Sequence, residues 1–542
     1  MLRRLAKHDI ADLARRVGWF TLSDADTEDY AVLSSAILDL LDEVDGALPG
    51  QSRASDDSLG DTSAGPATGA VDRHAGRRPL HDEDPFNAIV RWCRVQRVDA
   101  SGPLKGSRLG IKDSVSIAGI PLTFGSSVVR EFVPSVDSVV AERILGSGGQ
   151  IVAMTNMDNF AFSGGADTSA YGNIGNPFDP ERSAGGSSGG SAAALYYSGA
   201  VDATIGCDQG GSIRLPAAWC GVLGLKPTHS LVPYTGIAGI DATFDHAGPM
   251  ARSVSMLARL LAAVAGKHPS DPRQQEVSFD ADSLLRIAGS SADSFDGMHI
   301  GLLAEGFSEE GDLRRRTSAA IRGCGERLAL AGAEVEEVSI PAHLTSGGIA
   351  FAGFIEGMAA LVRGGGNGYH WPGRYSPELA RALAGGLHAH GDELPPQLKL
   401  VCLLGEYLSR DYGGAVYAAA QNERPKLRHA YDVPLQRYDA LLLPTAPYPA
   451  YKHDPALSVP DRVLRGWEPL GNCAPLDMTG HPAITLPVAT VDGLPVGAML
   501  IGRHWDDARL IDLAGRYERR FGWDKVISER QSAAVGPAMP PV

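Results

Sequence analysis

Residues 184–214 read AGGSSGGSAAALYYSGAVDATIGCDQGGSIR and contain two glycine–serine clusters, one around Ser187 and one around Ser212. Between the clusters, residues 191–199 have the composition of a short helix. Residues 201–208 form an apolar run bounded by turn residues, which predicts a buried strand. The stretch therefore predicts a helix followed by a strand, and Ser212 follows the end of that strand.

The same alternation of helix and strand continues on both sides of this stretch. Apolar runs predict strands at 108–115, 299–305, 438–447 and 481–488, and the pattern predicts helix, turn and strand over 138–157 and helix then strand over 317–340. Such alternation is typical of an α/β protein in which helices cover a sheet. We therefore predict a large mixed β-sheet flanked by helices.

The N-terminal region differs from the rest of the chain. Apolar residues at helical spacing predict one helix near residues 10–17 and a second over 30–44. The following residues lack periodicity and are rich in Gly, Ser, Asp and Ala. The predicted organisation is a helical domain at 1–48, a flexible linker at 49–80, a catalytic domain at 81–530 and a disordered tail at 531–542.

Composition and charge exclude several classes of partner. The 542 residues carry a formal net charge of −15, which argues against capture of nucleic acid or of an anionic membrane surface. The most apolar stretch, residues 255–266, is short and contains Arg259, so we predict a core helix rather than a membrane span. No apolar segment of a signal peptide follows the basic start.

Cysteine usage is sparse and suggests no metal site. The six cysteines form no C-x-x-C pair, and no Cys/His spacing is typical of zinc. Scattered cysteines in a long chain indicate reduced thiols and a cytoplasmic protein. We predict no metal and no cofactor.

The second cluster has the residues that an oxyanion site requires. Gly210 and Gly211 stand directly before Ser212, after the predicted strand. Because glycine tolerates unusual backbone angles, successive N–H groups there can converge on one point, as stabilisation of a tetrahedral oxyanion requires. A lone Gly-Gly-Ser is nevertheless more often a tight turn, so this pattern needs a second catalytic group.

The first cluster matches the nucleophile elbow G-x-S-x-G, with Ser187 as the serine. That interpretation requires a strand before the serine and a particular histidine after it. Residues 173–184 look like a loop, and nothing selects one of the later histidines. A phosphate-binding loop is excluded because no Gly-Lys-Ser/Thr follows the glycines. The elbow therefore remains a minor alternative.

Lys112 is the candidate base, at the end of a predicted strand. A lone lysine is more often solvated. Burial would lower its pKa and allow the neutral amine to accept a proton from a serine.

Together these segments strongly resemble the amidase signature family. The resemblance rests on GIKDSVSIAG (110–119), TNMDNFAFSGG (155–165), GNPFDPERSAGGSSGGSAAA (175–194), DQGGSIRLPAAWCGVLGLKPTHS (208–230), AGPMARSV (247–254), YDALLLPTAPYPA (438–450) and GHPAITLPVATVDGLPVGAMLIGRHWDDARLI (480–511). It covers residues 81–525 and is weaker over 270–430. It implies a Ser-Ser-Lys mechanism in which Ser212 is the nucleophile, Ser187 the bridging serine with a cis peptide bond, and Lys112 the base.

The resemblance also implies the remaining parts of the site. The oxyanion would contact the backbone N–H groups of Gln209, Gly210, Gly211 and Ser212. Ser187 and Ser212 are 25 residues apart, one more than is usual in the family, so Ser188 is the alternative relay. The residues implied in the wall of the substrate pocket are Phe162, Ser163, Gly164 and Gly165.

Three further features have less defined roles. Asp208 and Arg214 are predicted to hold the nucleophile loop. His246 is predicted to be a hydrogen-bonded structural histidine. The aromatic segment GYHWPGRY (368–375) belongs either to the core or to the substrate site.

The function that the resemblance implies is hydrolysis of the C–N bond of small aliphatic or aromatic amides by a cytoplasmic homodimer, as in relatives of the nitrile-degradation type. Carbamate or hydrazide hydrolysis on the same machinery is one alternative. Another is a glutamine-hydrolysing subunit of an amidotransferase that acts on aminoacyl-tRNA.

Overall fold

In the computed structural model the chain falls into two compact units, residues 1–65 and residues 66–542. The structure describes residues 4–17, 22–32, 34, 70–129, 132–275, 279–366 and 371–523. In the first unit, helix α1 (Lys7–Val17) buries Ile10 and Ala14, which lie four residues apart on one face. Residues 24–32 are also helical, so the second helix begins earlier than the sequence predicted; most of its predicted length lies outside the described residues.

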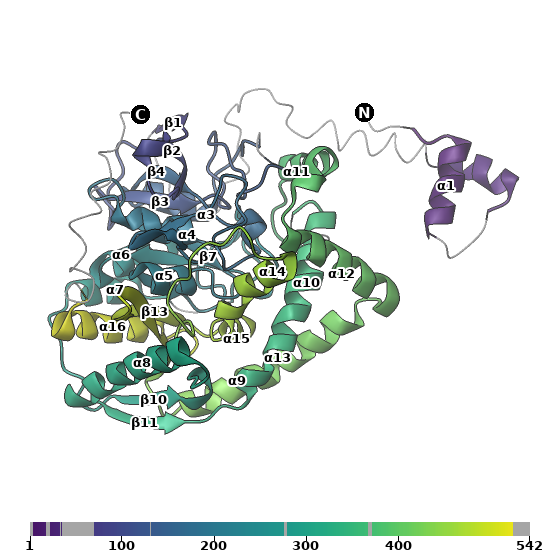
Figure 1. The fold of residues 1–542 in the computed structure, drawn as a ribbon. Coiled ribbons are helices and arrows are strands. Elements are labelled where there is room, and N and C mark those ends of the chain that lie inside the picture. Colours follow the sequence, from purple (N-terminus) through teal and green to yellow (C-terminus); the bar gives the residue numbers. More distant parts are fainter. Residues whose placement is uncertain are drawn as a thin grey trace. The chain divides into compact units, whose positions relative to one another are not determined.

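The second unit is built on one twelve-stranded sheet (Figure 1). Across the sheet the strands are β1 (Val71–Arg77), β2 (Ile89–Arg97), β4 (Gln150–Thr155), β3 (Arg108–Lys112), β7 (Ala203–Asp208), β9 (His246–Ala251), β8 (Leu223–Lys226), β13 (Ala483–Val491), β14 (Leu494–Ile501), β12 (Ala440–Pro444), β10 (His299–Leu303) and β11 (Glu334–Val338). Every strand that the sequence predicted is present. The predicted mixed sheet is therefore confirmed.

The pairing at the centre of the sheet positions the site. Strand β3 runs parallel to both β4 and β7, with Leu109 opposite Ala203. Parallel neighbours end at the same edge of a sheet, which is where α/β proteins commonly bind ligands. Lys112 at the end of β3 and Asp208 at the end of β7 therefore reach the same edge.

The predicted linker at 49–80 is wrong over its last part, because residues 71–77 form the edge strand β1. Its sequence, VDRHAGR, is mostly polar, as charged edge strands are. Arg73 donates to Asp137 at 3.0 Å, which ties this strand to the body of the unit. A polar edge strand has little apolar alternation, so its sequence looks like that of a linker.

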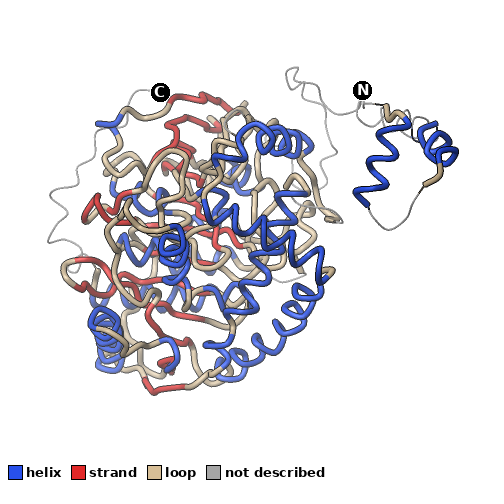
Figure 2. The backbone as a smooth tube through the Cα atoms, turned by 45° about the vertical axis from the view of Figure 1, so that its right-hand side comes forward, coloured by secondary structure: helices blue, strands red, loops and turns tan. Residues whose placement is uncertain are grey.

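Helices flank the sheet, as predicted (Figure 2). In the second unit they are α3 (Val139–Gly146), α4 (Gly189–Ala193), α5 (Arg214–Cys220), α6 (Val254–Val264), α7 (Ala281–Ala288), α8 (Asp312–Leu330), α9 (Ala342–Thr345), α10 (Gly347–Arg363), α11 (Pro377–His390), α12 (Pro396–Tyr412), α13 (Ala415–Leu435), α14 (Val459–Trp467), α15 (Ala474–Thr479) and α16 (Asp507–Phe521). Helices α5 and α8 pack on β13 and β14, whereas α10, α12 and α13 pack on one another (Figure 1).

Two apolar helices are relevant to whether any segment of the chain could span a membrane. The predicted core helix is α6, in which Leu257, Leu260 and Leu261 are fully buried. Among the described residues, the segment Ala342–Arg363, which comprises α9 and α10, has the length and composition of a membrane span. Its α10 part packs on α12 and α13.

Candidate active site

Lys112 lies at the centre of the site and is fully buried. Its ammonium group donates to the hydroxyl oxygens of Ser187 at 2.7 Å and Ser188 at 2.8 Å. Burial lowers the pKa of Lys112 to about 8. Lys112 is therefore held against both serine hydroxyls, and its lowered pKa makes the neutral amine more accessible than in a solvated lysine.

The two serines of the first cluster have different surroundings. The Ser188 hydroxyl donates to the Cys207 carbonyl oxygen at 3.1 Å and accepts from the Cys207 N–H at 3.4 Å. The Ser187 hydroxyl has Lys112 as its one hydrogen-bond partner among the described residues. The Gly186–Ser187 peptide bond is cis, as the resemblance implied for the bridging serine.

Asp208 and Arg214 hold the loop that carries Ser212. The Asp208 carboxylate accepts from the backbone N–H groups of Gly211 at 2.6 Å and Ile213 at 3.0 Å. The fully buried Arg214 guanidinium donates to Asp208 at 2.9 Å and to Asp477 at 2.7 Å. Although burial opposes it, the attraction of Arg214 lowers the pKa of Asp208. The loop is thus fixed by a carboxylate that stays charged.

The predicted oxyanion donors separate into two groups. The N–H groups of Gln209, Gly210 and Ser212 have no hydrogen-bond partner among the described residues, and all three residues line the cavity described below. The N–H of Gly211 is occupied by Asp208, so the prediction that it faces the oxyanion is wrong for this structure. Gly211 has φ +132°, and a Cβ there would lie 2.7 Å from the Cys473 side chain. Its role is conformational.

Ser212 opens onto a cavity of about 280 Å³. Of the predicted pocket residues, Phe162 and Ser163 line this cavity. Gly164 is not among the lining residues; its N–H donates to the Gly466 carbonyl oxygen at 2.8 Å, so it holds the wall from behind. The prediction for Gly164 is therefore wrong in its detail.

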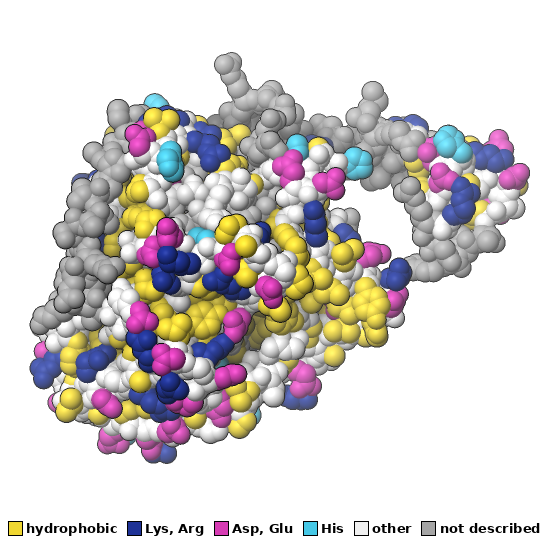
Figure 3. All heavy atoms as spheres, viewed as in Figure 1, with side chains coloured by type: hydrophobic (Ala, Val, Ile, Leu, Met, Phe, Trp, Pro, Cys, Tyr) yellow, Lys and Arg dark blue, Asp and Glu magenta, His cyan; other side chains and the backbone are white. Residues whose placement is uncertain are grey.

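Three aromatic residues that the sequence did not predict complete the cavity wall beside Phe162: Phe351, Phe354 and Trp467. Trp467 meets Phe162 at a ring-centroid distance of 6.0 Å and Phe351 at 5.3 Å. Phe354 meets Phe162 at 6.5 Å. Phe351 and Phe354 lie on α10, in the region of weak resemblance, and hydrophobic side chains gather on the surface where α10, α12 and α14 lie (Figure 3). In the sequence α10 looks like an ordinary apolar core helix, so nothing indicated that its aromatic side chains line a cavity.

Among the described residues that line the cavity, no polar side chain carries a charge. His343 contacts Tyr431 at 2.6 Å and Asn472 at 3.1 Å, and burial lowers its pKa, which keeps the ring neutral. No Asp, Glu, Lys or Arg is among the described residues that line the cavity. The site therefore fits an uncharged, largely apolar molecule.

Two other candidate segments lie elsewhere. In 368–375 the first three residues are outside those described, and Trp371 lines a second cavity of about 460 Å³ rather than the cavity at Ser212. His246 is buried and donates from Nδ1 to the Phe244 carbonyl oxygen at 2.7 Å, and it does not line the cavity at Ser212. It has the structural role that the sequence predicted.

The segment before Ser187 is not the loop that the sequence predicted. It contains β6 (Asp179–Ser183), which pairs with β5 (Gly175–Asn176) in a separate two-stranded sheet. Two prolines and several charged residues in that segment concealed the hairpin. A nucleophile elbow needs a strand of the main sheet in this position, so the hairpin also argues against an elbow at Ser187.

Comparisons with known proteins show which proteins this chain is similar to. It is 38% identical over 453 residues to an enantioselective amidase of Rhodococcus rhodochrous, in a match that covers 82% of this chain and 85% of that protein. It is 36% identical over 493 residues to a glutamyl-tRNA(Gln) amidotransferase subunit of Synechococcus sp. (strain CC9902), covering 86% and 95%. The crystal structure of the corresponding amidotransferase subunit from Thermotoga maritima superimposes with a TM-score of 0.64 at 28% identity, covering 81% and 88%.

The fold and these relatives define a hydrolase that acts on carbon–nitrogen bonds. The chain belongs to the amidase family, whose model matches residues 93–511. The resemblance inferred from the sequence is therefore confirmed, as is the amidohydrolase activity that it implied.

Proposed function

We propose that this enzyme hydrolyses small, uncharged amides with an aromatic or apolar substituent, through an acyl-enzyme formed on Ser212. The observation that carries the proposal is the buried Lys112–Ser187 pair next to a serine that opens onto an aromatic cavity. The 38% identity to an enantioselective amidase supports hydrolysis of an amide bond.

The chemistry begins with proton transfer. Neutral Lys112 accepts the proton of Ser187 while Ser187 accepts that of Ser212, and the Ser212 oxygen bonds to the amide carbon. The Ser188 N–H donates to the Ser212 carbonyl oxygen at 3.2 Å, which ties the two serine clusters together. A direct hydrogen bond between the Ser187 and Ser212 hydroxyls is not formed among the described residues; such catalytic bonds often tighten only when substrate is bound.

The negative charge that develops on the carbonyl oxygen is met by the unoccupied N–H groups of Gln209, Gly210 and Ser212. Each such donor stabilises the transition state by about 3 kcal/mol. The C–N bond then breaks as the proton returns through Ser187 to the leaving nitrogen. Water attacks the Ser212 ester by the same route in reverse, which releases the acid and restores the serine.

The amidotransferase alternative is less favoured by the cavity. Free glutamine carries a charged amino group and a charged carboxylate, and neither has an opposite charge among the described lining residues. Four aromatic rings instead offer apolar contact. We therefore favour a free amide over glutamine, although the relatives include amidotransferase subunits.

A substrate panel tests the proposal. The purified chain, without partner or tRNA, is assayed on benzamide, phenylacetamide, acetamide, a phenyl carbamate, benzhydrazide and glutamine. The aromatic amides are expected to have the highest kcat/KM. A clear preference for glutamine, or activity only with added partner proteins, would contradict the proposal, whereas a preference for the carbamate or hydrazide would change the leaving group and keep the mechanism.

The relay serine is tested by a matched pair of variants. Ser187→Ala is expected to lower kcat about 10³-fold or more, because it interrupts the proton path from Ser212. Ser188→Ala removes a hydroxyl already committed to Cys207 and is expected to lower kcat about 10-fold or less. Single-turnover kinetics of both variants measure the loss of rate in each. The reverse order of effects would assign the relay to Ser188.

The rate should also depend on pH in a defined sense. Lys112 acts as a base only when neutral, and burial lowers its pKa to about 8. The acylation rate is therefore expected to rise tenfold per pH unit below about pH 8 and to level off above it. Pre-steady-state acylation between pH 6 and 10 measures this profile. A rate that does not change across this range would contradict a lysine base.

We also infer a cytoplasmic location and self-association. All six cysteines are free, which supports a reducing compartment. In the first unit Leu13 and Tyr30 are exposed at 42% and 49%, and they offer apolar contacts for a second copy. Light scattering of the full chain and of a chain lacking residues 1–65 tests whether this unit makes the dimer.

A further inference from the structure

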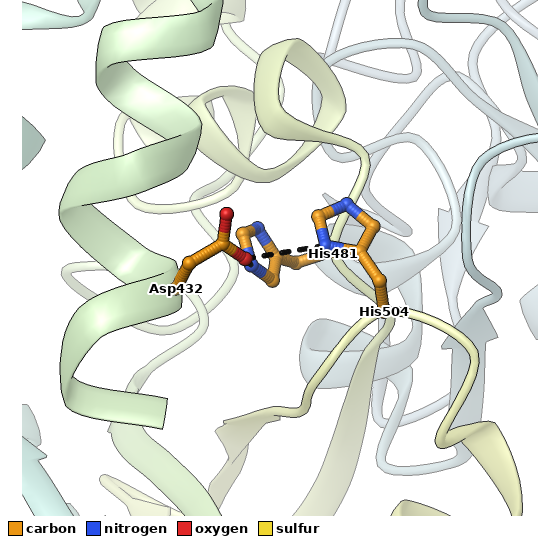
Figure 4. Close-up of side chains that lie close together, drawn as sticks. All are labelled: Asp432, His481 and His504. Atoms are coloured by element: carbon orange, nitrogen blue, oxygen red, sulfur yellow. Dashed lines mark hydrogen bonds and ion pairs between the residues drawn. The ribbon is translucent and has the colours of Figure 1, made fainter. Parts of the chain in front are cut away.

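Asp432, His481 and His504 form a cluster that the proposed mechanism does not use (Figure 4). Asp432 projects from helix α13, and the two imidazoles point toward its carboxylate (Figure 4). One potential ligand atom from each residue lies within 4.8 Å of the other two. None of the three lines the cavity at Ser212.

The topology of the sheet brings the two histidines together. His481 lies just before β13 and His504 just after β14, and these strands are antiparallel with Ala483 opposite Ile501. Residues that flank such a pair are neighbours, although they are far apart in the sequence. The ring centroids of His481 and His504 are 3.9 Å apart.

Thr479 fixes the orientation of both rings. His504 Nε2 lies 3.0 Å from the Thr479 carbonyl oxygen, which can only accept, so this nitrogen carries the hydrogen. In the neutral ring, His504 Nδ1 then has a lone pair and lies 3.5 Å from the Asp432 carboxylate. His481 Nδ1 bonds the Thr479 hydroxyl at 2.9 Å, and its Nε2 lies 3.0 Å from the same carboxylate oxygen.

A lone pair that faces a carboxylate oxygen is electrostatically unfavourable unless a cation or a hydrogen-bond donor lies between them. The alternative is a protonated His504 paired with Asp432. His504 Nδ1 lies 3.5 Å from the carboxylate oxygen, which is longer than the about 2.7–2.9 Å of a charge-assisted hydrogen bond and argues against that alternative. Metal-binding histidines commonly donate their second N–H to a backbone carbonyl, as His504 does here.

We propose that His481 Nε2, His504 Nδ1 and an Asp432 carboxylate oxygen bind a divalent transition-metal ion, with Zn²⁺ as the best fit. Metal–ligand bonds of about 2.0–2.2 Å in a tetrahedron separate ligand atoms by roughly 3.3–3.5 Å. The carboxylate oxygen already lies 3.0 Å from one ring nitrogen and 3.5 Å from the other. Two imidazoles and one carboxylate suit zinc better than magnesium or calcium.

The site would act on the structure rather than on the chemical step. It joins α13 to the ends of β13 and β14, and α13 also carries Tyr431, which contacts His343 at the cavity. The Arg428 guanidinium donates to the Thr479 carbonyl oxygen at 2.9 Å, so a cation stands close to the site and weakens metal affinity. We therefore expect a removable, stabilising metal ion.

The experiment measures zinc binding by the full chain after chelator treatment and dialysis. Calorimetry with ZnCl₂ is expected to give one site per chain, and the melting temperature should rise with zinc concentration. Co²⁺ should give visible d–d bands of a tetrahedral site. Since loss of an outer-shell partner alone weakens metal binding 10–100-fold, His504→Ala and Asp432→Asn are expected to weaken zinc binding more than about 10-fold.

The matched control is His388→Ala, which removes an exposed histidine elsewhere and should leave zinc binding unchanged. Each variant is first melted without metal, so a folding defect is seen separately from a loss of binding. If either ligand variant melts too early to titrate, Thr479→Val keeps the ligands and tests the outer shell. Absence of a stoichiometric zinc site in the wild type, or equal binding by ligand and control variants, would overturn the proposal.

Discussion

Lys112→Met is expected to lower kcat/KM for a small amide by about 10⁴-fold or more. The substitution keeps the length of the side chain and removes the only nitrogen that bonds the Ser187 hydroxyl among the described residues. Without that base, Ser187 has no acceptor for its proton and cannot take the proton of Ser212. Acylation, rather than substrate binding, is the step that fails.

The stability of the same variant separates this loss from unfolding. Lys112 is fully buried, and burial depresses its pKa, so the unfolded chain holds the proton more tightly than the folded chain does. Below about pH 8 the folded protein therefore carries a buried charge at a cost that methionine removes. The melting temperature of Lys112→Met should be unchanged or higher at pH 7. Retained turnover in a folded variant would exclude the lysine base.

The sequence predicted the sheet because its inner strands are apolar and bounded by turn residues. Strands β3, β7 and β13 are buried over most of their length and appear as continuous apolar runs. The edge strand β1 and the hairpin β5–β6 are exposed in part and rich in charge, so nothing in their local sequence marked them as strands. The burial of a strand, more than the β-propensity of its residues, determined whether it could be predicted from the sequence.

The site was predictable to the extent that a motif fixes the backbone. The motifs placed Lys112, Ser187 and Ser212 in one region, and the structure brings them to one edge of the sheet. Which N–H groups remain unoccupied depends on the Asp208 carboxylate, a contact that no motif states. The prediction for Gly211 failed for that reason.

The aromatic wall and the Asp432 cluster arise from distant segments. Phe351 and Trp467 meet across a cavity, although α10 and α14 are far apart along the chain. His481 and His504 are neighbours only because β13 and β14 pair. Long-range pairing of this kind leaves no periodic signal in a single sequence, so specificity and metal binding had to come from the structure.

Ser212→Ala is expected to reduce kcat by about 10⁴–10⁶-fold, because it removes the hydroxyl that we propose forms the acyl-enzyme. The variant keeps the backbone N–H at residue 212 and the unoccupied N–H groups of Gln209 and Gly210, so substrate binding should change little. The residual rate would then report the oxyanion donors alone. A fall in kcat with nearly constant KM therefore separates the nucleophile from a residue that only shapes the cavity.

Covalent labelling locates the nucleophile directly. A fluorophosphonate loses fluoride as the serine oxygen bonds to phosphorus, and peptide mass spectrometry finds the modified residue. The label is expected on Ser212 in the wild type and in Ser188→Ala, and on no residue in Ser212→Ala. Lys112→Met should label slowly, because the same base activates Ser212 toward phosphorus and toward an amide. A label on Ser187 would reverse the two roles, and prompt labelling of the lysine variant would require a different base.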